Sequence, residues 1–180
     1  INADDLGSVY NYTSSETGGF LISGVQVEEG SFKTSAIPTA GSTVTRSPDI
    51  TTIEDNKFAK TNLLEYSERL DQSEWSKTGS FVSSQVLNAA LAPDGTQSAE
   101  EYQNLATGTN NVQQSVTTSA QSYTFSIYLK AKTASDVGKS ILIGGHTSAS
   151  IHLREVVQLP AEWTRFIKTG TTTSAAWNWG

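Results

Sequence analysis

Residues 122–132 read SYTFSIYLKAK, and this stretch decides the fold class. Its large apolar residues fall on alternate positions, namely Tyr123, Phe125, Ile127 and Leu129. The positions between them carry Thr124, Ser126, Tyr128 and Lys130. Successive side chains of a strand point to opposite faces of a sheet, so this period of two predicts a half-buried antiparallel strand.

Strand-like segments recur along the rest of the chain. We expect further strands at 20–27, 81–87, 112–117, 141–143, 151–155 and 163–168. Turn-forming residues separate them, because Gly permits positive φ, Pro presets φ, and Asn or Asp bonds to its own backbone. Residues 67–75 suggest a helix of at most one or two turns. The whole pattern predicts an all-β protein, an antiparallel β-sandwich of the jelly-roll kind.

Length and composition exclude several classes of protein. The 180 residues suffice for one domain, or for one domain and part of another. The net charge is −6 and the twelve Lys and Arg residues are scattered, which argues against a nucleic-acid-binding surface. The absence of Cys excludes disulfides and thiolate metal sites. No apolar run approaches the ~20 residues that a membrane-inserted helix needs.

Two stretches carry a resemblance to a known family. The first reads VQVEEGSF at 25–32, then TSAIPT at 34–39. The second reads NLLEYSE at 62–68 and continues to APDGT at 92–96. They resemble the end and the beginning of jelly-roll modules that recur in phage tail fibres and other virion-surface proteins. These modules are similar to carbohydrate-binding and galactose-binding-like sandwiches. The chain departs from the usual pattern at Ala36, where an aromatic residue is common.

The order of the two stretches shapes the expected domain organisation. The resemblance implies that residues 1–50 are the C-terminal strands of one module plus a linker. Residues 51–60 continue the linker, and residues 61–180 form a jelly roll that lacks its last strands. An unpaired sheet edge is a liability. The gap is therefore closed by chain beyond 180, by strands of a neighbouring chain, or by residues 1–50 in one permuted sandwich.

The resemblance also implies a function. It indicates a structural virion protein of tail-fibre or head-appendage type, placed on the virion surface and in some cases bound to a host-surface glycan. Its partners would be other virion proteins or copies of itself, with a homotrimer as a common fibre assembly. The alternative is a carbohydrate-binding module of a secreted, extracellular polysaccharide-active enzyme. A third hypothesis is a fragment of a depolymerase.

Catalysis is not expected from the sequence. Glycosidases need two placed carboxylates. The adjacent pairs Glu28-Glu29 and Glu100-Glu101 would point to opposite faces if they lie in strands. No nucleophile elbow, phosphate-binding loop or dinucleotide fingerprint occurs. We therefore predict that the chain is not an enzyme.

Aromatic residues supply the candidate ligand site. Trp177 and Trp179 share one face at period two, and such a pair can stack on the C–H faces of a sugar. The competing interpretation places both rings in the core or in an interface. Trp75 and Trp163 are predicted to be core residues.

Metal sites find little support in the sequence. Asp94, Glu100 and Glu101 are weak candidate ligands for Ca²⁺, which takes six to eight oxygens. A simple turn at 93–95 explains Asp94 without a metal. His146 and His152 are the only imidazoles, and with no third ligand evident a transition-metal site is not expected.

Overall fold

The computed structural model describes residues 13–14, 18–30, 35–46, 60–105, 108–147, 153–173 and 175–180. Within them, strands dominate, every strand pairing is antiparallel, and the single α-helix is the four-residue α1, Phe81–Ser84. The predicted all-β class is confirmed. In the described part of the chain, no helix has both the length and the apolar character that crossing a membrane requires.

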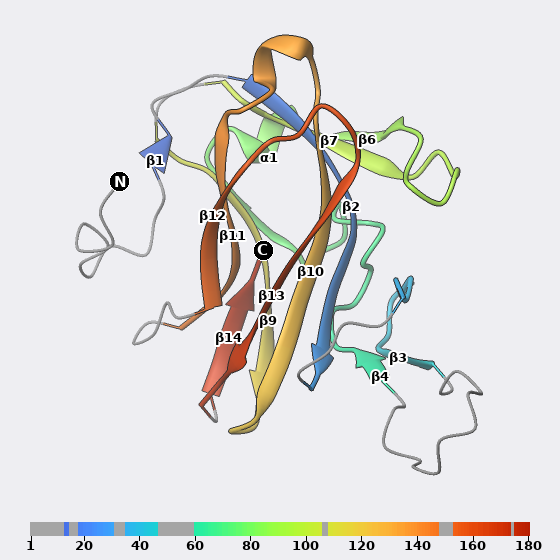
Figure 1. Ribbon diagram of the computed structural model, residues 1–180, viewed down its shortest axis with the longest axis vertical. Coiled ribbons are helices and arrows are strands. Elements are labelled where there is room, and N and C mark those ends of the chain that lie inside the picture. The colour runs from blue at the N-terminus through green and yellow to red at the C-terminus, as the bar shows by residue number, and fades with distance from the viewer. Residues whose placement is uncertain are drawn as a thin grey trace.

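Two five-stranded sheets form the body of the protein (Figure 1). The first has the order β13 (Thr164–Thr171), β10 (Ser122–Ala131), β2 (Gly18–Glu29), β7 (Ala99–Asn104) and β6 (Val86–Ala90). The second has the order β12 (Leu153–Gln158), β11 (Ser140–His146), β14 (Ala175–Trp179), β9 (Asn111–Thr118) and β5 (Ser76–Thr78).

Short elements complete the fold. β1 (Thr13–Ser14) pairs with β8 (Gly108–Thr109), and β3 (Val44–Arg46) pairs with β4 (Lys60–Asn62). A turn of 3-10 helix, η3, spans Ala134–Asp136. Its first turn is closed by a capping box, in which Thr133 and Asp136 exchange side-chain and backbone hydrogen bonds.

Strand β2 lies in the middle of the first sheet. It pairs with β10 on one side, where Val27 is opposite Phe125 and Ile22 is opposite Leu129. On its other side it pairs with β7, where Phe20 is opposite Tyr102. The segment before residue 47 and the segment after residue 59 thus contribute strands to one sandwich. Of the predicted linker 51–60, only Lys60 lies among the described residues.

A β-bulge at Gly24 changes which side of β2 faces the core. The alternation begins as expected, with Phe20 and Ile22 buried in the core. The register then shifts opposite 126–128, and Gly24 adopts φ 60°, a left-handed conformation that glycine tolerates without strain. Val25 and Val27 therefore continue the core face after the bulge, whereas unbroken alternation would have turned both outward.

The core lies between the two sheets and joins them through aromatic rings. The four apolar residues of β10 are all buried in it, as predicted: Tyr123, Phe125, Ile127 and Leu129. Phe125 stacks on Trp179 of the second sheet, with ring centroids 6.1 Å apart. Trp75 also belongs to this core, as predicted. Trp163 was also predicted to be a core residue, and this is wrong: it is only partly buried, and its indole nitrogen donates to the carbonyl of Leu91 at 2.9 Å.

The opposite face of β10 is less exposed than a half-buried strand implies. Thr124 and Ser126 are both buried. Thr124 donates to the carbonyl of Gly30 at 2.9 Å, and Ser126 accepts a hydrogen bond from Arg165 at 2.8 Å. Polar partners therefore cover the side of this strand that was expected to face water.

One local prediction differs from the structure. Residues 81–87 were expected to form one strand, but α1 occupies the first four and β6 begins at Val86. Phe81 packs against Phe20 and Tyr102, with centroids 5.6 and 5.5 Å away, and this packing takes precedence over its strand preference. Residues 67–75 form turns without an α-helix, within the predicted limit of one or two helical turns. The strand expected at 151–155 is described from Leu153, and residues 151–152 lie outside the described part.

Candidate functional site

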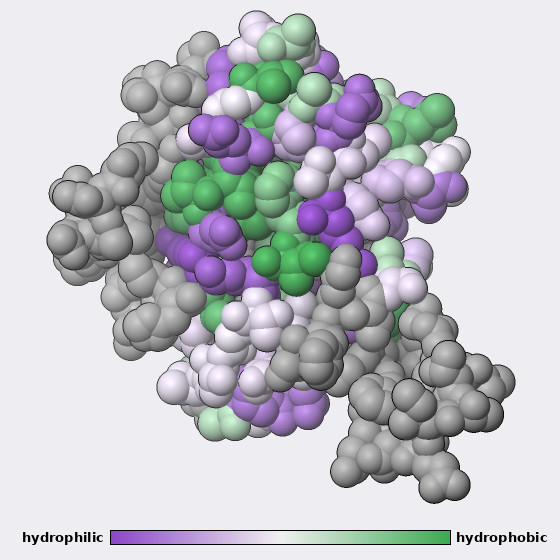
Figure 2. Space-filling view, in the orientation of Figure 1, coloured by the Kyte–Doolittle hydropathy of each residue, from purple (hydrophilic) through white to green (hydrophobic). Residues whose placement is uncertain are grey.

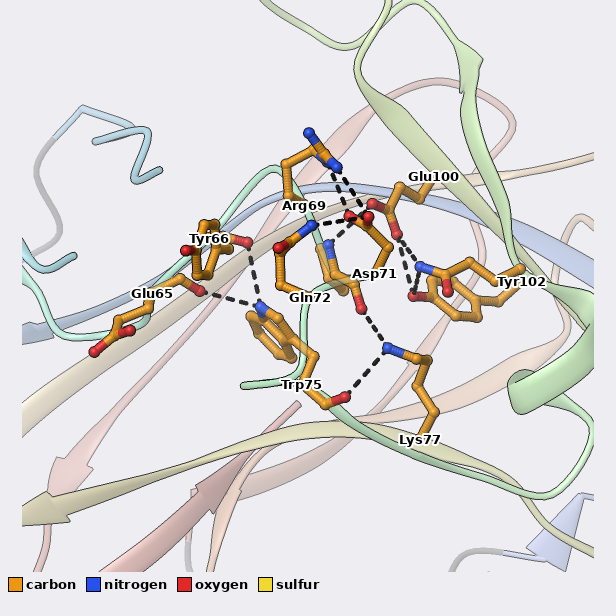
Figure 3. Close-up of polar contacts among 11 residues, drawn as sticks. Glu65, Tyr66, Arg69, Asp71, Gln72, Trp75, Lys77, Glu100 and Tyr102 are labelled. Atoms are coloured by element: carbon orange, nitrogen blue, oxygen red, sulfur yellow. Dashed lines mark hydrogen bonds and ion pairs between the residues drawn. The ribbon is translucent and has the colours of Figure 1, made fainter. Parts of the chain in front are cut away.

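A buried carboxylate, Glu100, organises the polar cluster drawn in Figure 3. It lies two residues before the core residue Tyr102 on β7, so both side chains point between the sheets. Glu100 is 1% exposed. One carboxylate oxygen accepts from the backbone amide of Leu70 at 2.9 Å. The other accepts from the Gln85 amide at 2.6 Å and from the Tyr102 hydroxyl at 3.1 Å.

Hydrogen bonds hold the loop between β4 and β5 in place around the Glu100 carboxylate. The indole nitrogen of Trp75 donates to the carbonyls of Glu65 and Tyr66 at 3.1 and 3.2 Å. Lys77 donates through Nζ to the carbonyls of Leu70 and Trp75 at 2.6 and 3.2 Å (Figure 3). Backbone groups of the loop thus find partners inside the protein, as buried polar groups require.

Burial determines the electrostatics of the cluster. It raises the pKa of Glu100, although hydrogen bonds from Gln85, Tyr102 and Leu70 favour the charged form. Burial, followed by the nearby charge of Glu100, raises the pKa of Tyr102. A general acid must lie within hydrogen-bonding reach of its substrate. With Glu100 almost wholly buried, the arrangement supports a fastening role for this carboxyl group rather than proton transfer to a ligand.

A second carboxylate, the partly buried Glu68, connects the same loop to β2. It accepts from the hydroxyls of Ser23 at 2.9 Å and Ser98 at 3.4 Å. Burial raises its pKa, and the negative charge of Asp94 adds to the shift. The sequence suggested Glu68 only as an acidic residue in the first turn of a short helix, and not as an acceptor for Ser23 and Ser98.

The three candidate calcium ligands do not converge. Asp94 accepts from the amide and hydroxyl of Thr96 at 2.9 and 2.8 Å, which lowers its pKa and closes a turn. Glu100 points between the sheets, whereas Glu101 points to the other face of β7 and pairs with Lys132 at 2.5 Å. Throughout the described ranges, no three His, Asp or Glu side chains gather closely enough to hold a metal ion.

The candidate sugar platform is part of the core. Trp177 and Trp179 are 1% and 0% exposed, so neither ring has a face free to stack on a glycan. They stack on each other with centroids 5.8 Å apart. The period of two was predicted correctly, but their shared face is the one that meets the first sheet. The core interpretation of this pair is the one that the structure supports.

His146 lies at the end of β11 and is buried beside a cation. Nη2 of Arg154, on β12, lies 3.1 Å from Nδ1 of its ring. Burial and the charge of Arg154 lower the pKa of His146 to about 4, so the ring is neutral at physiological pH. His152, the other imidazole, lies outside the described residues.

A cavity of about 130 Å³ lies near His146 and Arg154. Much of its lining is apolar and comes from both sheets, including Phe20, Ile22, Ile127, Ile141 and Leu159. Strand patterns do not reveal such a space, because it depends on how the sheets pack. Apolar side chains also reach the surface: Val156 on β12 and Ile167 on β13 are 43% and 37% exposed. Figure 2 shows hydrophobic residues among hydrophilic ones on the face that these two strands present.

Asn62, from β4, joins the two stretches that carry the family resemblance. It is fully buried. Its amide nitrogen donates to the carbonyls of Val25 and Ile37 at 3.2 and 3.1 Å. Its oxygen accepts from the amides of Val27 and Leu64, both at 3.1 Å. One side chain thus satisfies backbone groups of β2, of the segment after it, and of its own loop.

A second set of bonds reinforces this connection. Thr39 and Ser67 bond reciprocally, each backbone amide donating to the other's hydroxyl at 2.7 Å. The Thr39 hydroxyl donates in turn to the carbonyl of Leu64 at 2.9 Å. Gln26 accepts from the amide of Ile37 at 2.5 Å. We call this set of residues the motif junction: Gln26, Ile37, Thr39, Asn62, Leu64 and Ser67.

In comparisons with models of protein families, with curated proteins and with solved structures, none matches this chain.

Proposed function

We propose that this chain is a structural module of a virion-surface fibre or appendage, of tail-fibre or head-appendage type. The motif junction supports this proposal. Gln26, Ile37 and Thr39 come from the stretch that resembles a module end, and Asn62, Leu64 and Ser67 come from the stretch that resembles a module beginning. These residues form hydrogen bonds with one another, so the residues that carry the resemblance also hold the two stretches together.

In this proposal the chain is not an enzyme. Glu68 and Glu100 serve as hydrogen-bond acceptors that hold the loop between β4 and β5 against the sandwich. Trp75 serves the same loop through its indole nitrogen. Such internal fastening suits a module whose task is to keep its shape, space its neighbours and assemble with them.

Immunogold microscopy of purified virions tests the assignment. Antibodies raised against the recombinant chain are expected to label fibres or appendages, and pre-adsorption with the same chain should abolish the label. Unlabelled particles, with the antigen recovered from the extracellular fraction instead, would contradict the proposal. That result would favour the alternative, a carbohydrate-binding module of a secreted enzyme.

Glycan binding is an added role within both proposals, and it needs aromatic rings other than Trp177 and Trp179. Tyr128 on β10 is half-buried, with the guanidinium of Arg165 5.6 Å from its ring centroid. Trp163, directly before β13, is also partly exposed. A glycan array with the wild-type chain and with Tyr128→Ala and Trp163→Ala tests this role. Loss of binding in these variants supports it, and equal binding by all three excludes these rings.

A further inference from the structure

Strand β2 is a central strand whose sheet partners are remote in sequence. It lies between β7 and β10, both of which come after residue 98. Among the described strands of this sheet, the next one along the chain is β6, which begins only at Val86. The strands around β2 therefore come from later parts of the chain. The backbone hydrogen bonds between β2 and these strands are the same whether β2 comes from the same copy of the chain or from another copy.

The position between β7 and β10 is specific for the sequence of β2. Without β2, β10 would keep only β13 as a partner and β7 would keep only β6. Two unpaired sheet edges would then face each other, and such edges recruit strands. The apolar face of β2, which includes Phe20, Ile22 and Val27, would also leave the core. A second copy of this chain carries the sequence that restores both the pairing and the packing.

The connection to the rest of the chain allows β2 to come from another copy. β3 and β4 pair antiparallel, with Val44 opposite Asn62, and residues 47–59 run between them. Thirteen residues span up to about 45 Å when extended. If two copies exchange residues 13–46 reciprocally, β1 and β3 of one pair with β8 and β4 of the other, and the motif junction forms between copies. The described contacts are then preserved in both halves, which makes exchange a low-cost route to a dimer.

We propose that two copies of this chain exchange residues 13–46 to form a closed dimer in which β2 of each copy completes the first sheet of the other. The exchange goes beyond the proposed function and does not depend on it. A secreted module with this topology would exchange in the same way. Labelling of virions and exchange of β2 are separate observations, so either can fail alone.

Mixed single-cysteine variants test the exchange in the full-length chain, which has no Cys of its own. Leu21 on β2 is opposite Lys130 on β10. Directly opposite residues of an antiparallel pair lie ~5 Å apart between Cα atoms, within disulfide range. L21C chains and K130C chains are mixed unfolded, refolded at high concentration and oxidised. A disulfide-linked heterodimer is expected, because β2 of one copy then lies against β10 of the other.

The matched control uses two strands that stay together in the same body. Ser122 on β10 is opposite Thr171 on β13, and neither strand belongs to the exchanged segment. A mixture of S122C and T171C chains is therefore expected to give no covalent heterodimer. Absence of heterodimer in the L21C and K130C mixture would overturn the proposal, and so would equal yields in the two mixtures.

A measurement on the wild-type chain tests the exchange even if the cysteine variants fail to fold. Chains labelled with ¹⁵N and unlabelled chains are refolded together at high concentration and weighed by native mass spectrometry. Dimers of intermediate isotopic mass are expected beside the pure ones. Only monomers of 19.3 kDa across the concentration range would overturn the exchange.

Discussion

The side-chain oxygen of Asn62 accepts a hydrogen bond from the backbone amide of Val27, 3.1 Å away and 35 positions earlier in the chain. The same side chain donates to the carbonyl of Val25. A primary amide has two donors and an acceptor within one small group. Asn62 can therefore satisfy backbone groups next to the Gly24 bulge, where the register with β10 shifts.

Asn62→Ala should destabilise the protein strongly. The substitution leaves buried amides and carbonyls at four positions without their partner, and each such loss costs about 1–3 kcal/mol before relaxation. We expect a loss of about 3 kcal/mol in the free energy of unfolding, measured by urea denaturation. Asn111→Ala is the matched control, since Asn111 is partly exposed, and it should cost under about 1 kcal/mol. Equal costs would contradict the role given to Asn62.

The two faces of β10 should respond differently to truncation. Phe125→Ala removes a ring that stacks on Trp179 in the core, and we expect a cost of about 3–5 kcal/mol. Tyr128→Ala, on the opposite face, removes a half-buried ring and a cation–π contact and should cost about 1 kcal/mol. Chemical denaturation of both variants checks the difference. Similar losses would mean that the faces of the strand are wrongly assigned.

Alanine substitutions at Gly144 and Gly95 distinguish the cost of steric crowding from the cost of backbone strain. Both have positive φ, at 111° and 85°. A Cβ atom on Gly144 would meet the carbonyl oxygen of Leu153 on the adjacent strand, whereas one on Gly95 meets nothing within 4 Å. Gly95→Ala should therefore cost about 1 kcal/mol, from the backbone conformation alone. Gly144→Ala should cost at least about 3 kcal/mol or prevent folding, because the backbone of β12 must move. Thermal unfolding that ranks the variants in the reverse order would contradict the pairing of β11 with β12.

Glu100 should make the protein less stable as the pH rises. Burial raises its pKa above 4.5 in the folded state, so the folded protein holds this proton more tightly than the unfolded chain does. Stability is then lost as the pH rises from about 4.5 through the folded pKa. Glu100→Gln removes this contribution, so relative to wild type the variant should gain stability between pH 4.5 and pH 8. Urea unfolding across this range is the measurement.

His146 should act with the opposite sign. Its pKa is about 4 in the folded state, compared with 6.5 in an unfolded chain, so the folded protein binds this proton more weakly. Stability is then lost as the pH falls from about 6.5 to about 4. His146→Gln should lose less stability over that interval than wild type does. If its stability curve ran parallel to that of the wild type, the burial of this ring beside Arg154 would be contradicted.

Periodicity predicted much of the sandwich and little of the site. The alternation at 122–132 was sufficient for β10, since its apolar face meets the second sheet. The same rule failed within β2, because a bulge at Gly24 leaves no mark on an alternating pattern. Trp177 and Trp179 show the other limit. Period two places two residues on one face without saying whether that face meets water or another sheet.

The role of Glu100 was accessible from the sequence only in part. A residue two positions before a core residue of the same strand shares its face, so a buried Tyr102 implies an inward Glu100. The sequence patterns did not identify Tyr102 as a core residue. The acceptor role toward Leu70 depends on the path of a turn-rich loop, which neither propensity nor periodicity specifies. The same holds for the motif junction, whose partners lie up to 37 positions apart.

The central claim is that β2 forms the middle of the first sheet, and amide hydrogen exchange monitored by NMR tests it most directly. The amides of Val25 and Val27 donate to Ser67 and Asn62, so those of Gln26 and Glu28, which alternate with them, face β10. The account predicts that the Gln26 and Glu28 amides exchange as slowly as those of Phe125 and Leu129 on β10, which open only with the sandwich. Fast exchange throughout β2, beside protected amides in β10 and β13, would contradict it. The first sheet would then form without the strand that the structure places at its centre.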